Sequence, residues 1–266
     1  MMLFDVLPNK FKIRIKKWLF KWNKEHWLAK YSEELKNFEK QNVLSMMETL
    51  EEVKKGKSLA RFGDGEILLM CGEEIYFQKY KLELATELKE ILYNKNEKLL
   101  VCLPTIFTAY NDYEKNWWLK FWYIRWADFK SRLNLNTHYG HSMVTRPDFF
   151  GAYKEQAVLA WKEVWNQKKV LFITGEGSKL MVDHSIFNNI TKKEIIYTLP
   201  ENAYDDLDRI VTKVKQEFDL QYLILIALGP SGTILAQRFS QLGYQAVDIG
   251  HITSSFEEVF TPSDNV

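Results

Sequence analysis

From residue 58 onward, short apolar segments alternate with longer segments of helical periodicity. The apolar segments are expected to form strands, and they cover residues 58–62, 99–103, 170–174, 195–199, 222–228 and 245–249. The segments between them are long enough for helices that cross from one parallel strand to the next. Most of these strands are too apolar for a sheet with one face in water. The sequence therefore predicts an α/β fold, with a mainly parallel sheet and helices on both faces.

Ligands of such sheets bind beyond the carboxyl ends of the strands, and three predicted strand ends carry polar, glycine-rich sequence. The first is Arg-Phe-Gly-Asp-Gly-Glu, residues 61–66. In extended or turn backbone, Asp64 and Glu66 can point their carboxylates the same way, whereas a helix would separate them by about 200°. Such a pair suits Mg²⁺ or Mn²⁺, which prefer oxygen ligands and bind substrate phosphates. The alternative is a turn followed by a helix that Asp64 caps.

The second strand end is Thr-Gly-Glu-Gly-Ser-Lys, residues 174–179, before another expected helix. Backbone N–H groups of a glycine-rich loop at a helix N-terminus can bind phosphate, and Lys179 would add a positive charge. The sequence lacks the Gly-Lys-Ser/Thr ending of a P-loop, so this signal is unspecific by itself.

The third strand end continues as Gly229-Pro-Ser-Gly232, a helix over 233–242, and the strand over 245–249, which contains Asp248. Asp248 follows Gly229 by about 20 residues, where dinucleotide-binding folds place the acid that binds ribose. The Gly-x-Gly-x-x-Gly pattern is incomplete. An enzyme that uses NAD or S-adenosylmethionine is therefore only the second candidate for the function of this chain. Ser231 either caps the helix or receives a phosphate.

Several segments, taken together and in order, resemble the GT-D glycosyltransferase family, once a domain of unknown function. They are residues 58–66, 77–80, 145–147, 175–180, 228–230 and 242–251. The most specific pair is the box at 61–66 and Gly-Tyr-Gln-Ala-Val-Asp-Ile-Gly-His at 243–251. The resemblance implies a Rossmann-like domain of GT-D type over residues 55–266, preceded by an N-terminal helical extension over residues 1–54.

The resemblance also implies an activity. A hexose, such as glucose, would pass from a UDP-sugar to a glycan acceptor, lipid- or protein-linked, in the synthesis of a bacterial surface polysaccharide or glycoprotein glycan. The family's Asp-x-Glu motif falls on Asp64 and Glu66, as ligands of Mn²⁺ or Mg²⁺, and its catalytic positions fall on His251 and Glu257. The expected nucleotide-sugar residues are Arg61, Gly63, Asp64, Gly175, Glu176, Ser178, Lys179, Gly229, Ser231, Asp248 and His251. The family often has Arg where this chain has Lys179, which keeps the charge but loses bidentate phosphate geometry.

Glycosyl transfer sets two chemical demands. Negative charge develops on the leaving UDP, and a metal together with Lys179 or Arg61 would stabilise it. The acceptor hydroxyl must lose a proton, for which Glu257 is the candidate base, with His251 as the alternative or as a pyrophosphate ligand.

The segment 117–129 is rich in aromatic residues and carries Trp118, Trp122 and Trp126 at steps of four. Such a stripe on a helix is usually core, but sugar rings stack on exposed indoles. Trp118 and Trp122, together with Arg146, are therefore the candidate acceptor residues.

The N-terminal residues 1–30 hold eight basic and two acidic side chains, a net charge of +6 that leaves −5 on the remainder. The total of +1 gives no overall field that would attract nucleic acid. Apolar residues recur at steps of three and four, which predicts a basic amphipathic helix within residues 9–27; they are Phe11, Ile15, Trp18, Leu19 and Trp22. This helix either packs on the domain or lies at an anionic membrane surface. A catalytically idle module docked to a membrane through it is a further alternative.

Cys71 and Cys102 match neither a redox nor a zinc spacing, and residues 1–30 contain no unbroken apolar run typical of a secretory signal. These features predict a reduced, cytoplasmic protein, with peripheral contact to the inner face of the membrane if the helix binds lipid.

Overall fold

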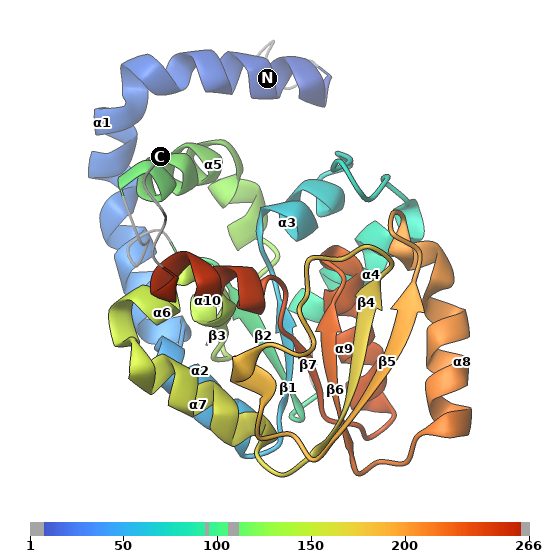
Figure 1. Ribbon diagram of the computed structural model, residues 1–266. Helices are drawn as coiled ribbons and strands as arrows, with labels where there is room; N and C mark the ends of the chain where they lie inside the picture. Colours follow the sequence, from blue (N-terminus) through green and yellow to red (C-terminus); the bar gives the residue numbers. More distant parts are fainter. Residues whose placement is uncertain (1–7, 94–95, 106–111, 262–266) are drawn as a thin grey trace, which may run out of the picture.

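The computed structural model describes residues 8–93, 96–105 and 112–261, and within them the chain forms a seven-stranded sheet with helices on both faces (Figure 1). The strands are β1 (Ser58–Arg61), β2 (Leu99–Leu103), β3 (Gly140–His141), β4 (Lys169–Gly175), β5 (Lys192–Thr198), β6 (Tyr222–Ala227) and β7 (Ala246–Asp248). Their order is β3-β2-β1-β7-β6-β4-β5, and every neighbouring pair is parallel. The predicted fold class is confirmed.

The strand order changes direction between β1 and β7, where Leu59 pairs with Val247. The chain builds β2 and β3 on one side of β1 and the remaining strands on the other. Such a switch point leaves a crevice at the carboxyl ends of the two strands, because the following connections leave toward opposite sides.

Ten α-helices surround the sheet in the described residues. They are α1 (Asn9–Asn42), α2 (Met46–Lys54), α3 (Asp64–Met70), α4 (Leu82–Leu92), α5 (Asp112–Lys130), α6 (Pro147–Tyr153), α7 (Glu155–Trp165), α8 (Leu207–Glu217), α9 (Pro230–Gln241) and α10 (Ile252–Phe260). Helix α9 packs on β1, β6 and β7 and contacts α4 and α8, whereas α2, α6, α7 and α10 cover the opposite face (Figure 1).

The core is apolar on both sides of the sheet. Strands β4 and β6 are buried almost throughout, as predicted for a doubly covered sheet. Trp161 and Trp165 stack with their ring centroids 5.4 Å apart, and Phe172 and Phe187 pack beside them. Both cysteines are free thiols.

Helix α1 packs on α5, but through a different side from the predicted apolar stripe. Phe20 and Trp27 both contact Tyr123, at centroid distances of 5.2 and 5.7 Å, and Lys16 Nζ donates to the Ile124 carbonyl at 3.0 Å. Three stripe residues remain exposed instead: Phe11, Trp18 and Trp22, the last to 77%. They face away from α5, because the turn of about 100° per residue in an α-helix places them on the side opposite Phe20 and Trp27.

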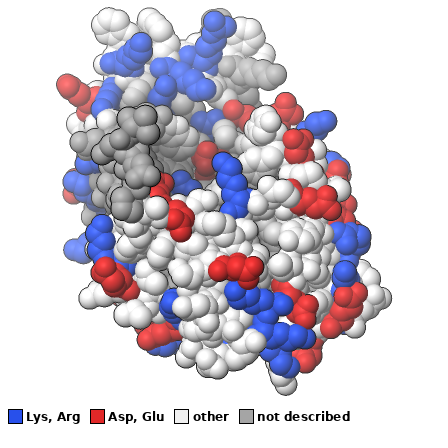
Figure 2. All heavy atoms as spheres, in the orientation of Figure 1, with Lys and Arg blue, Asp and Glu red and all other residues white. Residues whose placement is uncertain are grey.

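Lys and Arg side chains gather over α1 at the top of Figure 2, while the lower surface mixes both signs. No helix in the described ranges combines the length and the apolar character needed to cross a bilayer.

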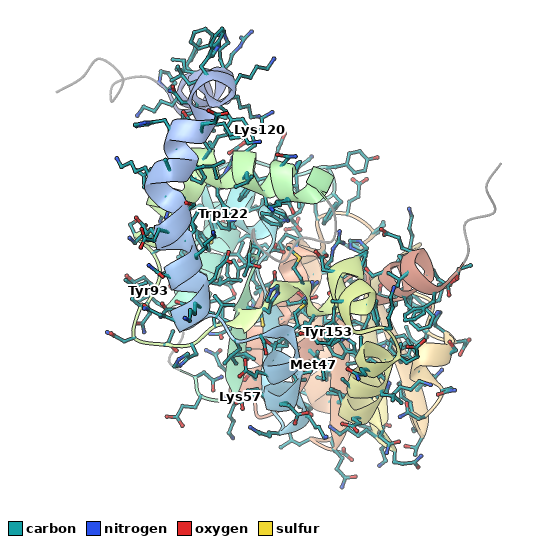
Figure 3. All side chains as sticks on the ribbon, turned by 90° about the vertical axis from the view of Figure 1, so that its left-hand side faces the viewer. Met47, Lys57, Tyr93, Lys120, Trp122 and Tyr153 are labelled. Atoms are coloured by element: carbon teal, nitrogen blue, oxygen red, sulfur yellow. The ribbon has the colours of Figure 1, made fainter. Side chains whose placement is uncertain are left out.

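The predicted aromatic segment forms helix α5, and its indole rings at Trp118, Trp122 and Trp126 are buried. Trp122 is only 2% exposed and packs against Trp118, Trp126 and Phe129 (Figure 3). An acceptor sugar therefore has no access to Trp122, which corrects that prediction.

Candidate active site

A pocket of about 450 Å³ lies at the carboxyl ends of the strands, at the switch point between β1 and β7. Nine of the predicted site residues line it: Arg61, Gly63, Asp64, Glu66, Trp118, Arg146, Gly229, Asp248 and His251. Seven others do not: Trp122, Gly175, Glu176, Ser178, Lys179, Ser231 and Glu257. Residues distant in sequence thus meet where the fold class leads one to expect a ligand.

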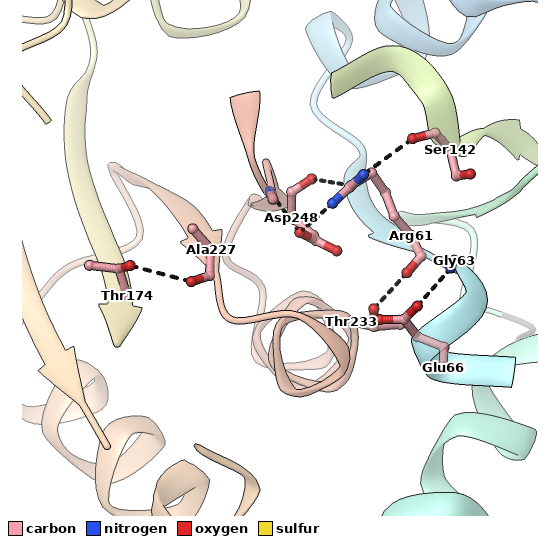
Figure 4. A network of polar contacts seen from close by, with 9 residues as sticks. Arg61, Gly63, Glu66, Ser142, Thr174, Ala227, Thr233 and Asp248 are labelled. Carbon is pink, nitrogen blue, oxygen red and sulfur yellow. Dashed lines mark hydrogen bonds and ion pairs between the residues drawn. The ribbon is translucent and has the colours of Figure 1, made fainter. Parts of the chain in front are cut away.

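The floor of the pocket contains an ion pair between Arg61 and Asp248 (Figure 4). Arg61 Nη2 lies 3.2 Å from Asp248 Oδ1, and its Nε donates to the Asp248 carbonyl at 3.0 Å. Its Nη1 donates to the carbonyl of Ser142 at 3.2 Å. A Cβ at Gly250, whose φ is +46°, would overlap the Arg61 guanidinium. Arg61 therefore joins the ends of β1, β3 and β7.

Asp248 is committed to this pair. Burial raises the pKa of its carboxyl, and the charge of Arg61 opposes that rise. The same Oδ1 also accepts the N–H of Gly250 at 3.0 Å. A carboxylate held in this way is not free to bind a ribose, so Asp248 does not match the acid of a dinucleotide fold.

Asp64 and Glu66 lie in the first turn of α3, which matches the helical alternative and not the extended or turn backbone expected of a pair of metal ligands. Asp64 is exposed, and its carboxylate has no hydrogen bond or salt bridge to any described residue. Glu66 is buried and its Oε2 accepts the N–H of Gly63 at 2.7 Å, as in a capping box. The cap is therefore supplied by Glu66 rather than Asp64, and the two carboxylates point in different directions.

Burial raises the pKa of Glu66 to about 7, although the hydrogen bond from Gly63 opposes the rise. Its protonation therefore changes near neutral pH. Within the described residues no cluster of three His, Cys, Asp or Glu side chains is arranged to hold a metal ion. Asp64 still fits an ion that is shared with substrate phosphates and water, the usual situation of Mg²⁺.

His251 and Arg146 lie on the cationic side of the pocket. Neither side chain has a hydrogen-bond or ion-pair partner among the described residues. The pKa of His251 is lowered mainly by desolvation, less by the positive charges of Arg146 and Arg61, and least by that of Lys179. A neutral imidazole beside an unpaired guanidinium can accept a proton while the guanidinium faces an anion.

The glycine-rich segment after β4 differs from the prediction. Residues 176–184 form turns rather than a helix, and the next helical turn is the short 3₁₀ segment Ser185–Phe187. A helix dipole is therefore absent from this strand end. Lys179 is exposed and outside the pocket lining, yet its charge reaches His251.

Glu257 lies on α10, outside the pocket lining. Its Oε1 is 2.7 Å from Nε2 of His184, and its Oε2 accepts from the hydroxyl of Thr261. Both hydrogen bonds lower the pKa of Glu257, and the bond with Thr261 has the larger effect. Glu257 joins α10 to the segment after β4, and its weakened basicity makes it a poorer candidate base than His251.

Ser231 is buried in the first turn of α9, where its hydroxyl donates to Oε1 of Gln78 at 3.2 Å. The hydroxyl of Ser231 therefore links α9 to Gln78, whereas the sequence had offered it as a possible phosphate contact. Gly229 does reach the pocket, with φ at +55°.

Three aromatic residues of the pocket lining were not predicted as site residues, namely Phe62, which is fully buried, Phe77 and Trp117. Phe77 belongs to the segment 77–80 that carries part of the family resemblance, and this membership was the feature of the sequence that could have identified it as a site residue. Nothing in the sequence distinguished Trp117 from the other aromatic residues of the segment 117–129.

Comparison with known proteins agrees with this geometry. Residues 59–262 match the family described as glycosyltransferase GT-D fold. The chain superposes with a TM-score of 0.75 and 31% identity on the highly conserved domain of unknown function 1792, described as having a distinct glycosyltransferase fold, covering 84% of this chain and 83% of that one. A glycosyltransferase from Streptococcus sanguinis gives a TM-score of 0.72 at 31% identity, covering 81% and 83%.

Two curated relatives are similar over 81% of this chain. They are a probable glycosyl transferase, Gly, of Streptococcus gordonii at 33% identity, and the glycosyltransferase GlyD of Streptococcus pneumoniae at 31%. The chain covers 33% and 27% of their lengths. The parallel sheet with its switch-point pocket defines an α/β domain, and the matches place this domain in the glycosyltransferase class. Within that class the chain belongs to the GT-D fold family.

Proposed function

We propose that this chain transfers a hexose from a UDP-sugar to a glycan acceptor. The observation that carries the proposal is the composition of the switch-point pocket, where Asp64, Arg146 and His251 share one cavity and where neither Asp64 nor Arg146 has an ion-pair partner among the described residues. A nucleotide-sugar needs both signs of charge, because its diphosphate pairs with cations and its metal pairs with a carboxylate.

Asp64 is proposed to hold Mn²⁺ or Mg²⁺ together with the diphosphate. When bound, the ion would stabilise the charge that develops on the leaving UDP. Glu66 supports this arrangement by fixing the first turn of α3 through Gly63, which places Asp64 at the mouth of the pocket.

Arg146 is proposed to face the diphosphate. Arg61 is less available for this task, since Asp248 and two carbonyl groups occupy its guanidinium. A fixed cation aimed at the leaving group stabilises the transition state more than the ground state. Lys179 adds charge at the rim.

His251 is proposed to accept the proton of the acceptor hydroxyl. Its lowered pKa keeps the imidazole neutral near pH 7, the form that can take up a proton. Trp118 is largely buried, and the 8% of its surface that stays exposed is proposed to contact the acceptor sugar in the same pocket.

The acceptor is proposed to be a lipid- or protein-linked glycan, for a bacterial surface polysaccharide or glycoprotein, made on the cytoplasmic side of the membrane. The outer side of α1 supports contact with an anionic bilayer. Phe11, Trp18 and Trp22 are exposed there, and residues 1–30 carry a net charge of +6. Aromatic residues at headgroup depth with cationic neighbours are typical of peripheral membrane helices.

A binding screen tests the donor assignment. UDP with Mn²⁺ should raise the melting temperature more than NAD or S-adenosylmethionine does, because a ligand of the native state stabilises it by mass action. A larger shift with NAD or S-adenosylmethionine would favour the alternative class of enzyme.

A further inference from the structure

The pocket has two chemically different parts. Arg146 follows β3 and His251 follows β7, so these two basic side chains reach the pocket from opposite sides of the switch point. An apolar part of the pocket is lined by Ile75, Phe77 and Pro230, with Phe77 against Gly229, and Ile75 and Pro230 against Gly65. A ligand with one charged and one flat, apolar part would therefore bind in a single orientation.

Phe77 is held on a rigid turn. The N–H of Ile75 donates to the Gln78 carbonyl at 3.1 Å, and the Gln78 N–H donates back at 3.2 Å. The side chain of Gln78 is buried and accepts from the hydroxyl of Ser231 and from the N–H of Tyr204. The N–H of Asn202 donates to the Phe77 carbonyl at 2.8 Å. The backbone beneath the ring is fixed before any ligand arrives.

Gly229 makes room for the ring. A Cβ at this position would lie 2.7 Å from Cε2 of Phe77, closer than real Cβ atoms come to other atoms. The φ of +55° also disfavours any side chain there. The glycine at the end of β6 thus lets the ring lie against the backbone at the edge of the pocket.

The Phe77 side chain is 40% exposed, and within the described residues no other aromatic ring packs against it. Trp117 has a similar exposure, but its ring already stacks on Phe121, with centroids 5.3 Å apart, and contacts Trp118. Phe77 is therefore the pocket aromatic whose face is left open.

We propose that Phe77 is the surface on which the base of the nucleotide donor stacks, with the diphosphate directed toward Arg146 and His251. The proposal rests on the proposed function. Stacking between a base and an aromatic side chain typically changes affinity about ten-fold or more. In this orientation the transferred sugar lies on the side of His251, away from Phe77.

Calorimetric titration with UDP and with inorganic pyrophosphate, both in Mg²⁺, separates the base from the phosphates. Phe77→Ala should weaken UDP binding at least ten-fold and leave pyrophosphate binding within two-fold of wild type. Phe77→Tyr should bind UDP like the wild type, because it keeps the ring. Tyr76→Ala is the matched control, since Tyr76 is 95% exposed and outside the pocket lining.

Unchanged UDP affinity in Phe77→Ala, or an equal loss for UDP and pyrophosphate, would overturn the stacking role. Thermal unfolding of each variant checks that the fold is kept. A wild-type protein that binds no nucleoside diphosphate would instead contradict the proposed function, so the two failures are distinguishable.

Discussion

Arg61 Nη2 lies 3.2 Å from Asp248 Oδ1, and this pair fastens β1 to β7 directly beneath the pocket. Removing one partner of a buried pair leaves the other charge uncompensated, which commonly costs about 3 kcal/mol or more. We therefore expect Arg61→Ala and Asp248→Asn each to lower the free energy of unfolding by that amount, measured by urea denaturation. A loss below about 1 kcal/mol in both variants would show that the pair is not a structural tie.

Asp64 and Glu66 should respond differently to substitution. Asp64→Asn should lower glycosyl transfer at least 100-fold and leave the melting temperature within about 2 °C, because this carboxylate is exposed and has no hydrogen bond or ion pair to any described residue. Glu66→Ala should lower the melting temperature as well, because it removes the cap on Gly63. Glu66→Gln is the matched control, since an amide oxygen can still accept that N–H. Equal melting temperatures for Glu66→Ala and Asp64→Asn would contradict the assigned roles.

The pH dependence of transfer tests His251. Its pKa lies below the ordinary 6.5, so the loss of activity that comes from protonation of the imidazole should begin only below pH 6.5. Arg146→Gln removes one of the charges that lower this pKa, and should move the acid limb of kcat/KM toward pH 6.5. An acid limb that persists in His251→Asn would exclude His251 as the group that titrates.

His141 should make the fold sensitive to acid. Burial lowers its pKa to about 4, and its Nδ1 accepts the N–H of Met143 at 3.2 Å. The unfolded chain takes up a proton near pH 6.5 and the folded chain does not, so stability present above pH 6.5 is lost as the pH falls toward 4. Between pH 7 and 5 this amounts to about 2 kcal/mol. Denaturant curves of His141→Gln should lack this fall, and an identical slope in both proteins would refute it.

The outer side of α1 is open to a direct test with vesicles. Phe11→Ala/Trp18→Ala/Trp22→Ala should abolish sedimentation with anionic vesicles at low salt, while Leu159→Ala, at an exposed leucine on α7, should not. Wild-type binding should also weaken at high salt, since the lysines act through screened charge. Substitution is preferable to deleting residues 1–30, because Phe20 and Trp27 pack on α5. Binding by the triple variant equal to wild type would contradict membrane contact through this helix.

Much of the fold was predictable because parallel strands buried on both faces must be apolar. The run over 99–103 became β2 with the same bounds. β3 was missed because Gly140–His141 is too short to produce a pattern. Whether the apolar stripe of α1 packs on the domain was left open by the sequence, since a stripe of apolar residues does not say which partner is available.

The site was predictable to the extent that it follows from strand ends. Arg61, Gly229 and His251 meet because β1, β6 and β7 end at the same edge of the sheet. The backbone after β4 was wrongly predicted to start a helix, and at residues 64–66 the sequence left a turn and a helix start as alternatives, because a glycine-rich sequence permits both. Which of them forms depends on tertiary partners, such as Thr253 for the N–H of Met181.

The most direct measurement is the release of UDP from a panel of UDP-hexoses in Mn²⁺, compared between wild type and Asp64→Asn at equal concentrations of folded protein. The account predicts release from at least one UDP-hexose by the wild type and a decrease of 100-fold or more in the variant. Equal release by the two proteins, or no release from any UDP-hexose while another class of nucleotide-sugar is consumed, would contradict it.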